Sequence, residues 1–420
     1  MNKRLTVEIA SFLLMGFTLL FTACVKDSCK ETHTYTYFEP VYKAKEEVKA
    51  NIKSNASKEI EKPGKIYTLG NYIFLNEVDR GIHVIDNSNP SNPVNISFID
   101  IPGNMDLAVK GNMLYADMYG DLVTIDITDP RSVKLTKAIE GIFPERMWGN
   151  GFRGSGDIVV DWIRKDTTVT ESCERQNWLF EGRGDVFFSA SKANAAVSAS
   201  PVGVGGSMAR FTIVNDYMYT VDMHNLKCIS ISNAADPVLK NNVNAGFDIE
   251  TIFPFKNTLF VGSMGGMYIF DITNPESPVA KSTFVHSRAC DPVIADDKYA
   301  YVTLRAGTTC GPSANELQVI DIKDLASPSL VKSYPLSGPY GLAKDEDLLF
   351  ICDGTAGLKA YNAADVQNLQ LKKTISGIDT YDVIAMNKIA LVVAKDGLYQ
   401  YDYSNVSDIK LLSKIVIEKK

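Results

Sequence analysis

Short apolar runs separated by turn residues recur along most of the chain, and residues 104–144 show the pattern in full. Four runs rich in Val, Ile, Leu and Tyr follow one another there, separated at positions 111–112, 119–120 and 128–130. β-Branched and aromatic residues favour extended strands, whereas Gly, Asn, Asp and Pro favour turns. The pattern therefore predicts a four-stranded meander, which cannot bury both of its faces unless copies of it stack.

The third of these strands carries a signature that recurs seven times from residue 64 onward. The copies span residues 81–90, 121–130, 225–237, 266–275, 316–325, 357–366 and 397–406. In each copy the apolar run ends at an Asp or a substitute for it, namely Asp86, Asp126, Ser230, Asp271, Asp321, Asn362 and Asp402. Most copies lie about 40 residues apart, and two longer intervals indicate insertions near residues 145–206 and 306–315.

This signature resembles the Leu-Val-Ile-Val-Asp strand of the LVIVD-repeat family, and the resemblance covers residues 64–420. It implies an all-β fold, a seven-bladed β-propeller of four-stranded antiparallel blades. In such blades the loops between second and third strands share one face with the connections between blades, because antiparallel neighbours alternate direction. Both insertions are therefore expected on this face, called the connection face below.

The aligned aspartates invite a metal-binding or catalytic interpretation, but their context favours a structural one. Each ends a strand and is followed by Ser or Thr, then Asn, Asp or Pro, or by related residues. A carboxylate in that position accepts backbone N–H groups and fixes the turn. We expect these residues to shape turns, and we expect no metal or cofactor.

The first residues have the features of a targeting signal. Lys3 and Arg4 precede an uncharged run at residues 9–21, which is short for a membrane span but suits a signal peptide at residues 1–23. The ending at Cys24 resembles a bacterial lipobox and implies a lipid anchor on that residue, whereas the alternative is an ordinary signal peptide with a chance cysteine. The residues after Cys24 resemble those of Bacteroidetes-type lipoproteins at the outer membrane or cell surface.

Residues 24–63 are then predicted to be a lipidated tether. It contains a strand-like stretch at residues 35–38 that ends at Pro40. A short amphipathic helix follows, because Ala44, Val48 and Ile52 are spaced four apart on a charged background.

Composition excludes one class of partner. The chain has 420 residues and a net charge of −7, and it has no Lys/Arg cluster beyond the first four residues. Binding to nucleic acid requires a basic surface, so we expect none.

The cysteines suit an oxidising compartment. Cys290 and Cys310 fall at the start and in the enlarged loop of the fifth blade, and we predict a disulfide between them. Cys352 is a rival partner, and a zinc site using His286 and His224 is disfavoured because no ligand pair has the usual spacing. The sequence does not fix the pairing of Cys29, Cys173 and Cys228.

Acidic residues recur near the starts of the first strands, where the channel of a propeller opens. They are Asp106, Glu250, Asp291 and Asp382. Lys65, Arg210 and Gly341 take the same place in other blades, so the set is not an acidic ring. The favoured interpretation is solvated strand starts, and the alternative is a funnel for a cation or substrate.

No nucleophile-elbow or zinc-protease motif is present. We therefore predict a non-enzymatic, lipid-anchored scaffold that binds a protein or glycan on its connection face. Trp148, Trp162 and Trp178 all lie in the long insertion and are the binding candidates, because Trp is enriched at binding hot spots. Alternatively, these three Trp rings pack the insertion against the propeller. The alternative function is a hydrolase or lyase at the channel mouth, with the four acidic residues as acid or base and His286 assisting.

Overall fold

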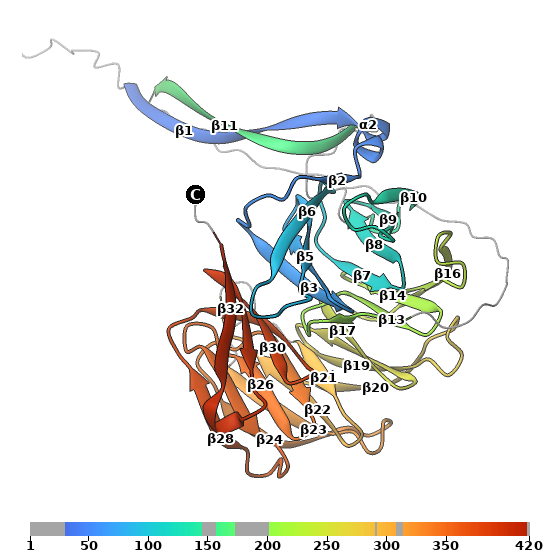
Figure 1. Cartoon of the computed structure of the whole chain (residues 1–420), viewed down its shortest axis with the longest axis vertical. Helices are drawn as coiled ribbons and strands as arrows, with labels where there is room; N and C mark the ends of the chain where they lie inside the picture. The colour runs from blue at the N-terminus through green and yellow to red at the C-terminus, as the bar shows by residue number, and fades with distance from the viewer. Residues whose placement is uncertain (1–29, 145–156, 173–200, 290–291, 308–313, 418–420) are drawn as a thin grey trace, which may run out of the picture. The chain divides into compact units, whose positions relative to one another are not determined.

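The structure is a computed structural model that describes residues 30–144, 157–172, 201–289, 292–307 and 314–417 (Figure 1). The chain divides into two compact units. The larger one comprises residues 42–161 and 189–420, and the smaller one comprises residues 1–41 and 162–188.

The larger unit contains seven antiparallel four-stranded blades whose strands pair in chain order. Their bounds are β3 (Pro63–Leu69), β4 (Tyr72–Glu77), β5 (Gly81–Asp86) and β6 (Val94–Asp100); β7 (Leu107–Lys110), β8 (Met113–Met118), β9 (Asp121–Asp126) and β10 (Lys134–Ile139); β13 (Phe211–Val214), β14 (Tyr217–Val221), β15 (Asn225–Ser230) and β16 (Val238–Asn244); β17 (Ile249–Phe255), β18 (Thr258–Ser263), β19 (Gly266–Asp271) and β20 (Val279–Val285); β21 (Val293–Ala295), β22 (Tyr299–Leu304), β23 (Glu316–Asp321) and β24 (Ser329–Pro335); β25 (Leu342–Asp345), β26 (Leu348–Cys352), β27 (Leu358–Asn362) and β28 (Gln370–Ile375); β29 (Thr380–Met386), β30 (Ile389–Ala394), β31 (Gly397–Asp402) and β32 (Lys410–Val416).

The strands with the repeat signature are the third strands of the blades, as predicted, and the all-β seven-bladed propeller is confirmed. Their side chains are mostly buried on both faces, because each blade packs between two neighbours. The fourth strands are more exposed, and each pairs with its third strand through a β-bulge. Bulges of this kind twist an edge strand and so discourage pairing with another chain.

The first strands of successive blades contact one another around the whole ring, and β29 meets β3 where the ring closes. None of the described strands is exchanged between blades one and seven. Apolar side chains of both blades, Ile66 and Leu391 among them, share one core cluster instead. Across the same seam, Gln400 and Asn87 exchange two hydrogen bonds of 2.6 and 3.0 Å. Side-chain packing and a paired amide therefore close the ring.

Blade one is extended by two short strands, β2 (Ser54–Asn55) on its outer edge and β12 (Val204–Gly205) on its inner edge. The expected helix is present as α2 (Lys45–Ala50). Val48 and Ile52 are buried in the core of blades one and two. This part of the expected tether is thus packed against the propeller.

The smaller unit is built on a two-stranded ribbon of β1 (Lys30–Ala44) and β11 (Asp157–Ser172), which lie side by side in Figure 1. Strand β11 lies within the long insertion, and β1 does not stop at Pro40 as the sequence predicted. Among the described residues, no helix is long and apolar enough to cross a membrane.

Candidate functional site

The seven aligned residues at the ends of the third strands all shape turns, as predicted. In each, a side-chain oxygen accepts the backbone N–H two residues later, over distances of 2.7 to 3.5 Å. Hydrogen bonds to the side chain and backbone of Thr273 lower the pKa of Asp271 to about 2. These residues lie on the face opposite the connection face, called the turn face below, and their oxygens are committed to the fold.

The starts of the first strands carry a different set of charges. Around the ring from blade seven to blade four, the residues are Asp382, Lys65, Asp106, Arg210 and Glu250, so the sign alternates. The other four all act electrostatically on Lys65, which shows that they gather in space. We call these five residues the axial cluster.

Asp106 and Asp382 of the axial cluster are not solvated strand starts, so that expectation was wrong for these two residues, whereas Glu250 is half-buried. The exposed fractions of Asp106 and Asp382 are 2% and 3%. Burial raises the pKa of Asp106 to about 7 and that of Asp382 to about 6, with the Lys65 ammonium opposing the rise. Burial also lowers the pKa of Lys65. Such carboxyl groups could exchange protons near neutral pH if a substrate reached them.

The end of the long insertion and the three residues after it, residues 201–209, lie along the inner strands instead of on the connection face. The Gly111 N–H donates to the Pro201 carbonyl at 2.7 Å, and the Gly203 N–H donates to the Val109 carbonyl at 2.9 Å. Strand β12 then pairs with β3, antiparallel to it. We call residues 201–209 the channel segment, because it follows the first strands of blades one and two toward their starts.

At the axial cluster, the channel segment is held by several blades at once. The Ser207 hydroxyl donates to Asp382 at 3.2 Å and accepts the Leu342 N–H at 2.8 Å. The Lys65 ammonium donates to the Met208 carbonyl, and the Ala209 carbonyl accepts the N–H of Ile252 at 2.9 Å. Directly after the segment, the backbone N–H of Arg210 donates to Asp106. Blades one, two, four, six and seven therefore all bind this short stretch.

Close approach explains the glycines of this stretch. A Cβ atom on Gly206 would lie 2.0 Å from the Asp382 carboxylate, and one on Gly203 would lie 2.4 Å from the Tyr67 ring. A Cβ atom on Gly341 would lie 2.2 Å from the same carboxylate of Asp382. The Asp382 carboxylate therefore occupies the space that a side chain at residue 341 would need.

The structure does not gather the remaining predicted residues at this site. His286 is half-buried in the connection after blade four, and its Nδ1 lies 2.8 Å from the Ser287 carbonyl oxygen. His224 packs edge-on against Phe247 with ring centroids 5.4 Å apart. Trp162 is half-exposed on β11. The other predicted residues lie outside the described ones, namely Cys24, Trp148, Cys173, Trp178, Cys290, Asp291 and Cys310.

Cys228 and Cys352 are buried free thiols, so the rival disulfide through Cys352 is not formed. Burial raises the pKa of Cys228 to about 12, so its thiol stays protonated. Within the ranges that the structure describes, no three His, Cys, Asp or Glu residues are grouped to hold a metal ion.

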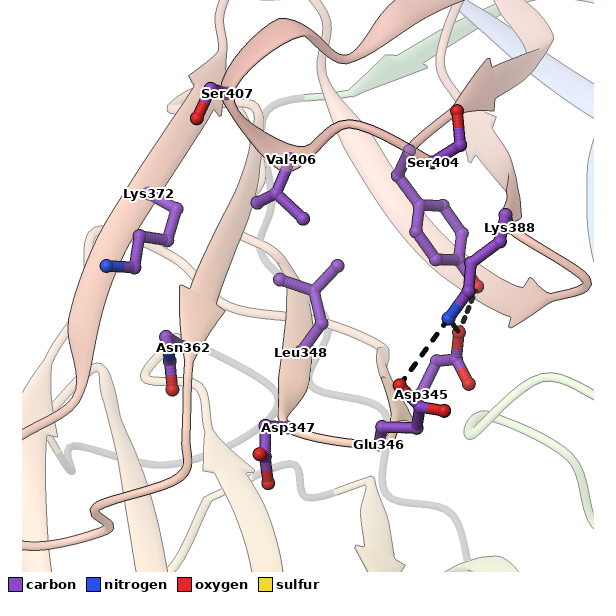
Figure 2. A pocket seen from close by; sticks show the side chains of 11 residues that line it. Asp345, Glu346, Asp347, Leu348, Asn362, Lys372, Lys388, Ser404, Val406 and Ser407 are labelled. Atoms are coloured by element: carbon purple, nitrogen blue, oxygen red, sulfur yellow. Dashed lines mark hydrogen bonds and ion pairs between the residues drawn. The ribbon is translucent and has the colours of Figure 1, made fainter.

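A cavity of about 370 Å³ opens on the turn face between blades six and seven (Figure 2). Leu348 and Val406 give it an apolar floor. At one wall the Asp345 carboxylate is bonded to Lys388 at 3.0 Å and to the Tyr403 hydroxyl at 2.9 Å. Because these charged groups already satisfy one another, the cavity is a weaker candidate than the axial cluster.

Four segments match the LVIVD repeat, namely residues 64–100, 103–139, 205–245 and 288–335. The chain therefore contains LVIVD repeats in four places, all within residues 64–420, where the signature predicted seven. No curated protein sequence matches the chain.

Three solved structures show what the fold is similar to. The periplasmic gluconolactonase PpgL of Pseudomonas aeruginosa is 10% identical, with a TM-score of 0.54 over 85% of this chain and 96% of that one. A protein from Lactobacillus plantarum is 11% identical, with a TM-score of 0.53 over 85% and 97% of the two chains. The computationally designed protein Ika8 is 10% identical, with a TM-score of 0.51 over 86% and 90%. At such identities the likeness concerns the fold alone.

Proposed function

We propose that this chain is a lipid-anchored propeller of the cell envelope that binds a partner and catalyses no reaction. One observation carries the second part of the proposal. The channel segment binds the axial cluster directly, through Ser207 on Asp382 and through Met208 on Lys65. The axial cluster contains the groups best suited to acid–base chemistry, and the Ser207 hydroxyl and the Met208 carbonyl already bind two of them. The channel segment therefore blocks a substrate from reaching these groups on the side where the segment lies.

The competing proposal is a hydrolase or lyase at the channel mouth, with Asp106 and Asp382 as acid and base. It is supported by the pKa values of these groups, about 7 and about 6, because a catalytic acid or base works best near the ambient pH. The structural role proposed here predicts that Asp106→Asn and Asp382→Asn alter stability. An enzyme would instead lose turnover of a hydrolysable ester, lactone or glycoside in both variants while remaining folded.

The envelope part of the proposal rests on the sequence before residue 30. A basic start, an apolar run and a lipobox-like ending at Cys24 support acylation of that cysteine at the outer membrane or cell surface. Mass spectrometry of membrane-extracted protein should find lipid on an N-terminal Cys24. A product that begins elsewhere and remains in the soluble fraction would contradict it.

The described part of the connection face exposes apolar side chains at blades three and four. Met223 lies between β14 and β15, Phe247 lies between β16 and β17, and Val285 ends β20. Phe247 and Val285 are 72% and 74% exposed. Apolar rings and thioethers are enriched at protein interfaces, so this surface favours a protein over a glycan as the partner.

A pair of matched variants tests this surface. Phe247→Asp should abolish capture of the partner from native membranes without lowering the melting temperature. Val279→Asp is the control, because Val279 is 56% exposed at the opposite end of β20. Proteins lost from the first variant but retained by the second would support the proposal, whereas identical capture by both would contradict it.

The insertion can be tested separately from the channel segment. Replacing residues 162–188 with a short Gly/Ser link removes Trp162 and Trp178 but retains the channel segment. We expect a folded propeller that binds its partner less tightly. Replacing residues 145–206 also removes most of the channel segment, so that variant should be markedly less stable. Equal stability of the two would show that the channel segment does not contribute to the fold.

A further inference from the structure

The ribbon of β1 and β11 exposes large apolar side chains, and among its described side chains only Ile158 and Val159 are buried. Tyr35, Tyr37 and Phe38 on β1 are 49%, 45% and 58% exposed, and Trp162 and Ile163 on β11 are 44% and 50% exposed. A two-stranded ribbon is at best marginally stable in water, and exposed aromatic rings add to its cost. The ribbon is therefore expected to lie against another apolar surface.

One face of the ribbon carries three of these side chains. Tyr35 and Tyr37 share a face with Glu39, because alternate residues of a strand point the same way. Glu39 forms an ion pair with Lys165 on β11. Ile163 lies two residues before Lys165 and so belongs to the same face.

The opposite face of the ribbon carries the other two exposed side chains, Phe38 and Trp162. The Thr36 hydroxyl donates to the Asp166 carboxylate at 2.6 Å, which places both on this face. Alternation adds Phe38 from β1, and Trp162 and Arg164 from β11. Each face thus combines apolar or aromatic side chains with an ion pair, Glu39 with Lys165 on one face and Asp166 with Arg164 on the other. A flat protein surface would cover only one of the two faces.

The distance to the predicted anchor limits what can lie nearby. Only residues 25–29 separate Cys24 from the start of β1 at Lys30. Even fully extended, the link from Cys24 to Lys30 spans no more than about 20 Å. A lipid on Cys24 would therefore hold the first part of β1 close to the headgroups of the bilayer.

We propose that the ribbon inserts into the headgroup region of a lipid bilayer, an inference that rests on the acylation of Cys24 set out above. Tyr and Trp rings are the side chains most enriched at this depth, because one end of each is apolar and the other polar. The charges of Lys165 and Arg164 are compensated by Glu39 and Asp166, so the ribbon brings paired charges to this region. The headgroup region can surround both faces of a thin ribbon, as a flat protein surface cannot.

The experiment uses the chain from residue 24 with Cys24→Ser, so that no lipid contributes to binding. Trp148→Phe and Trp178→Phe leave Trp162 as the reporter. On vesicles of phosphatidylethanolamine and phosphatidylglycerol, Trp162 emission should shift to shorter wavelength and be quenched by brominated acyl chains. Tyr35→Ser with Tyr37→Ser should weaken partitioning by about tenfold or more, because aromatic rings dominate the apolar area that is buried.

Two control variants test whether the rings of the ribbon, and not exposed apolar area in general, cause the partitioning. Tyr35→Phe with Tyr37→Phe preserves the ring area and should partition at least as well as the parent. Val279→Ser removes an apolar side chain that is 56% exposed on the propeller and should leave partitioning unchanged. The absence of a shift in the parent, or an equal loss with Val279→Ser, would overturn the ribbon proposal. Either result would leave Cys24 acylation intact, and mass spectrometry tests that modification separately.

Discussion

The aspartates at the turns and those of the axial cluster have the same side chain in opposite surroundings. Asp271 is on the surface, and hydrogen bonds from its turn lower the pKa of its carboxyl to about 2. Asp106 is buried beside the channel segment, and burial raises the pKa of its carboxyl to about 7. Turn residues like Asp271 recur in every blade because the turn is part of the repeat. Buried carboxyl groups like that of Asp106 occur only where several blades meet.

This difference separates what stabilises a blade from what stabilises the ring. Turn residues act within one blade, so losing one costs little elsewhere. The axial cluster connects blades that are distant in sequence, and its charges are only partly compensated. Perturbing it should therefore have larger effects on stability and stronger dependence on pH.

The largest effect is expected from Lys65→Met. Removing the ammonium takes away the cation that opposes the raised pKa of Asp106 and Asp382, together with the donor to the Met208 carbonyl. Removing one partner from a group of buried charges typically costs about 3 to 5 kcal/mol. Denaturant unfolding at pH 8 should show a loss of this order. The loss should be smaller at pH 5, where both carboxyls are neutral, and smaller again in the triple variant with Asp106→Asn and Asp382→Asn. A loss independent of pH would contradict the electrostatic account.

The intact protein should also respond to pH. The folded-state pKa values of Asp106 and Asp382 lie above the usual value of 3.8, so their contribution is full below pH 3.8 and is lost as pH rises through 6 and 7. We expect the free energy of unfolding to fall by a few kcal/mol, as an order of magnitude, between pH 5 and pH 8. Asp106→Asn should flatten this decline, and an unchanged slope would contradict the assignment.

A smaller effect is expected from Gly206→Ala. The added Cβ would collide with the Asp382 carboxylate, and overpacking of this kind costs about 1 to 3 kcal/mol. Gly338→Ala is the matched control, because a Cβ atom there meets nothing within 4 Å. Thermal unfolding should separate the two variants. Equal melting temperatures would mean that the channel segment shifts without cost to accommodate the added Cβ atom, and so is not held tightly at the axial cluster.

The smallest effect is expected at the turns. Asp271→Ala removes an acceptor of the Thr273 N–H at an exposed site, so about 1 kcal/mol should be lost. This loss should disappear at acidic pH. The folded pKa of Asp271 is depressed, so its contribution is present above pH 3.8 and is lost as pH falls toward 2. A loss that persisted at pH 2 would point to a cause other than the charge.

The repeats and their turns could be predicted from sequence because the signals are local. Asp126 and Thr128 are two residues apart, and their hydrogen bond follows from that spacing. Gly206 and Asp382 are far apart in the chain, so the sequence alone could not show that the Asp382 carboxylate occupies the space of a side chain at residue 206. The alternation of charge at equivalent first-strand positions was visible, with Gly341 as the gap, and could have indicated a compensated cluster.

Hydrogen exchange of the channel segment tests the central claim most directly. The N–H groups of Gly203 and Gly206 donate to Val109 and Ile66 of the inner strands, at 2.9 and 3.2 Å. If the segment is an integral part of the closed channel, residues 203–210 should exchange as slowly as β3 and β7 in the native protein. Exchange within seconds, at the rate of an exposed loop, would show an open channel and an accessible axial cluster.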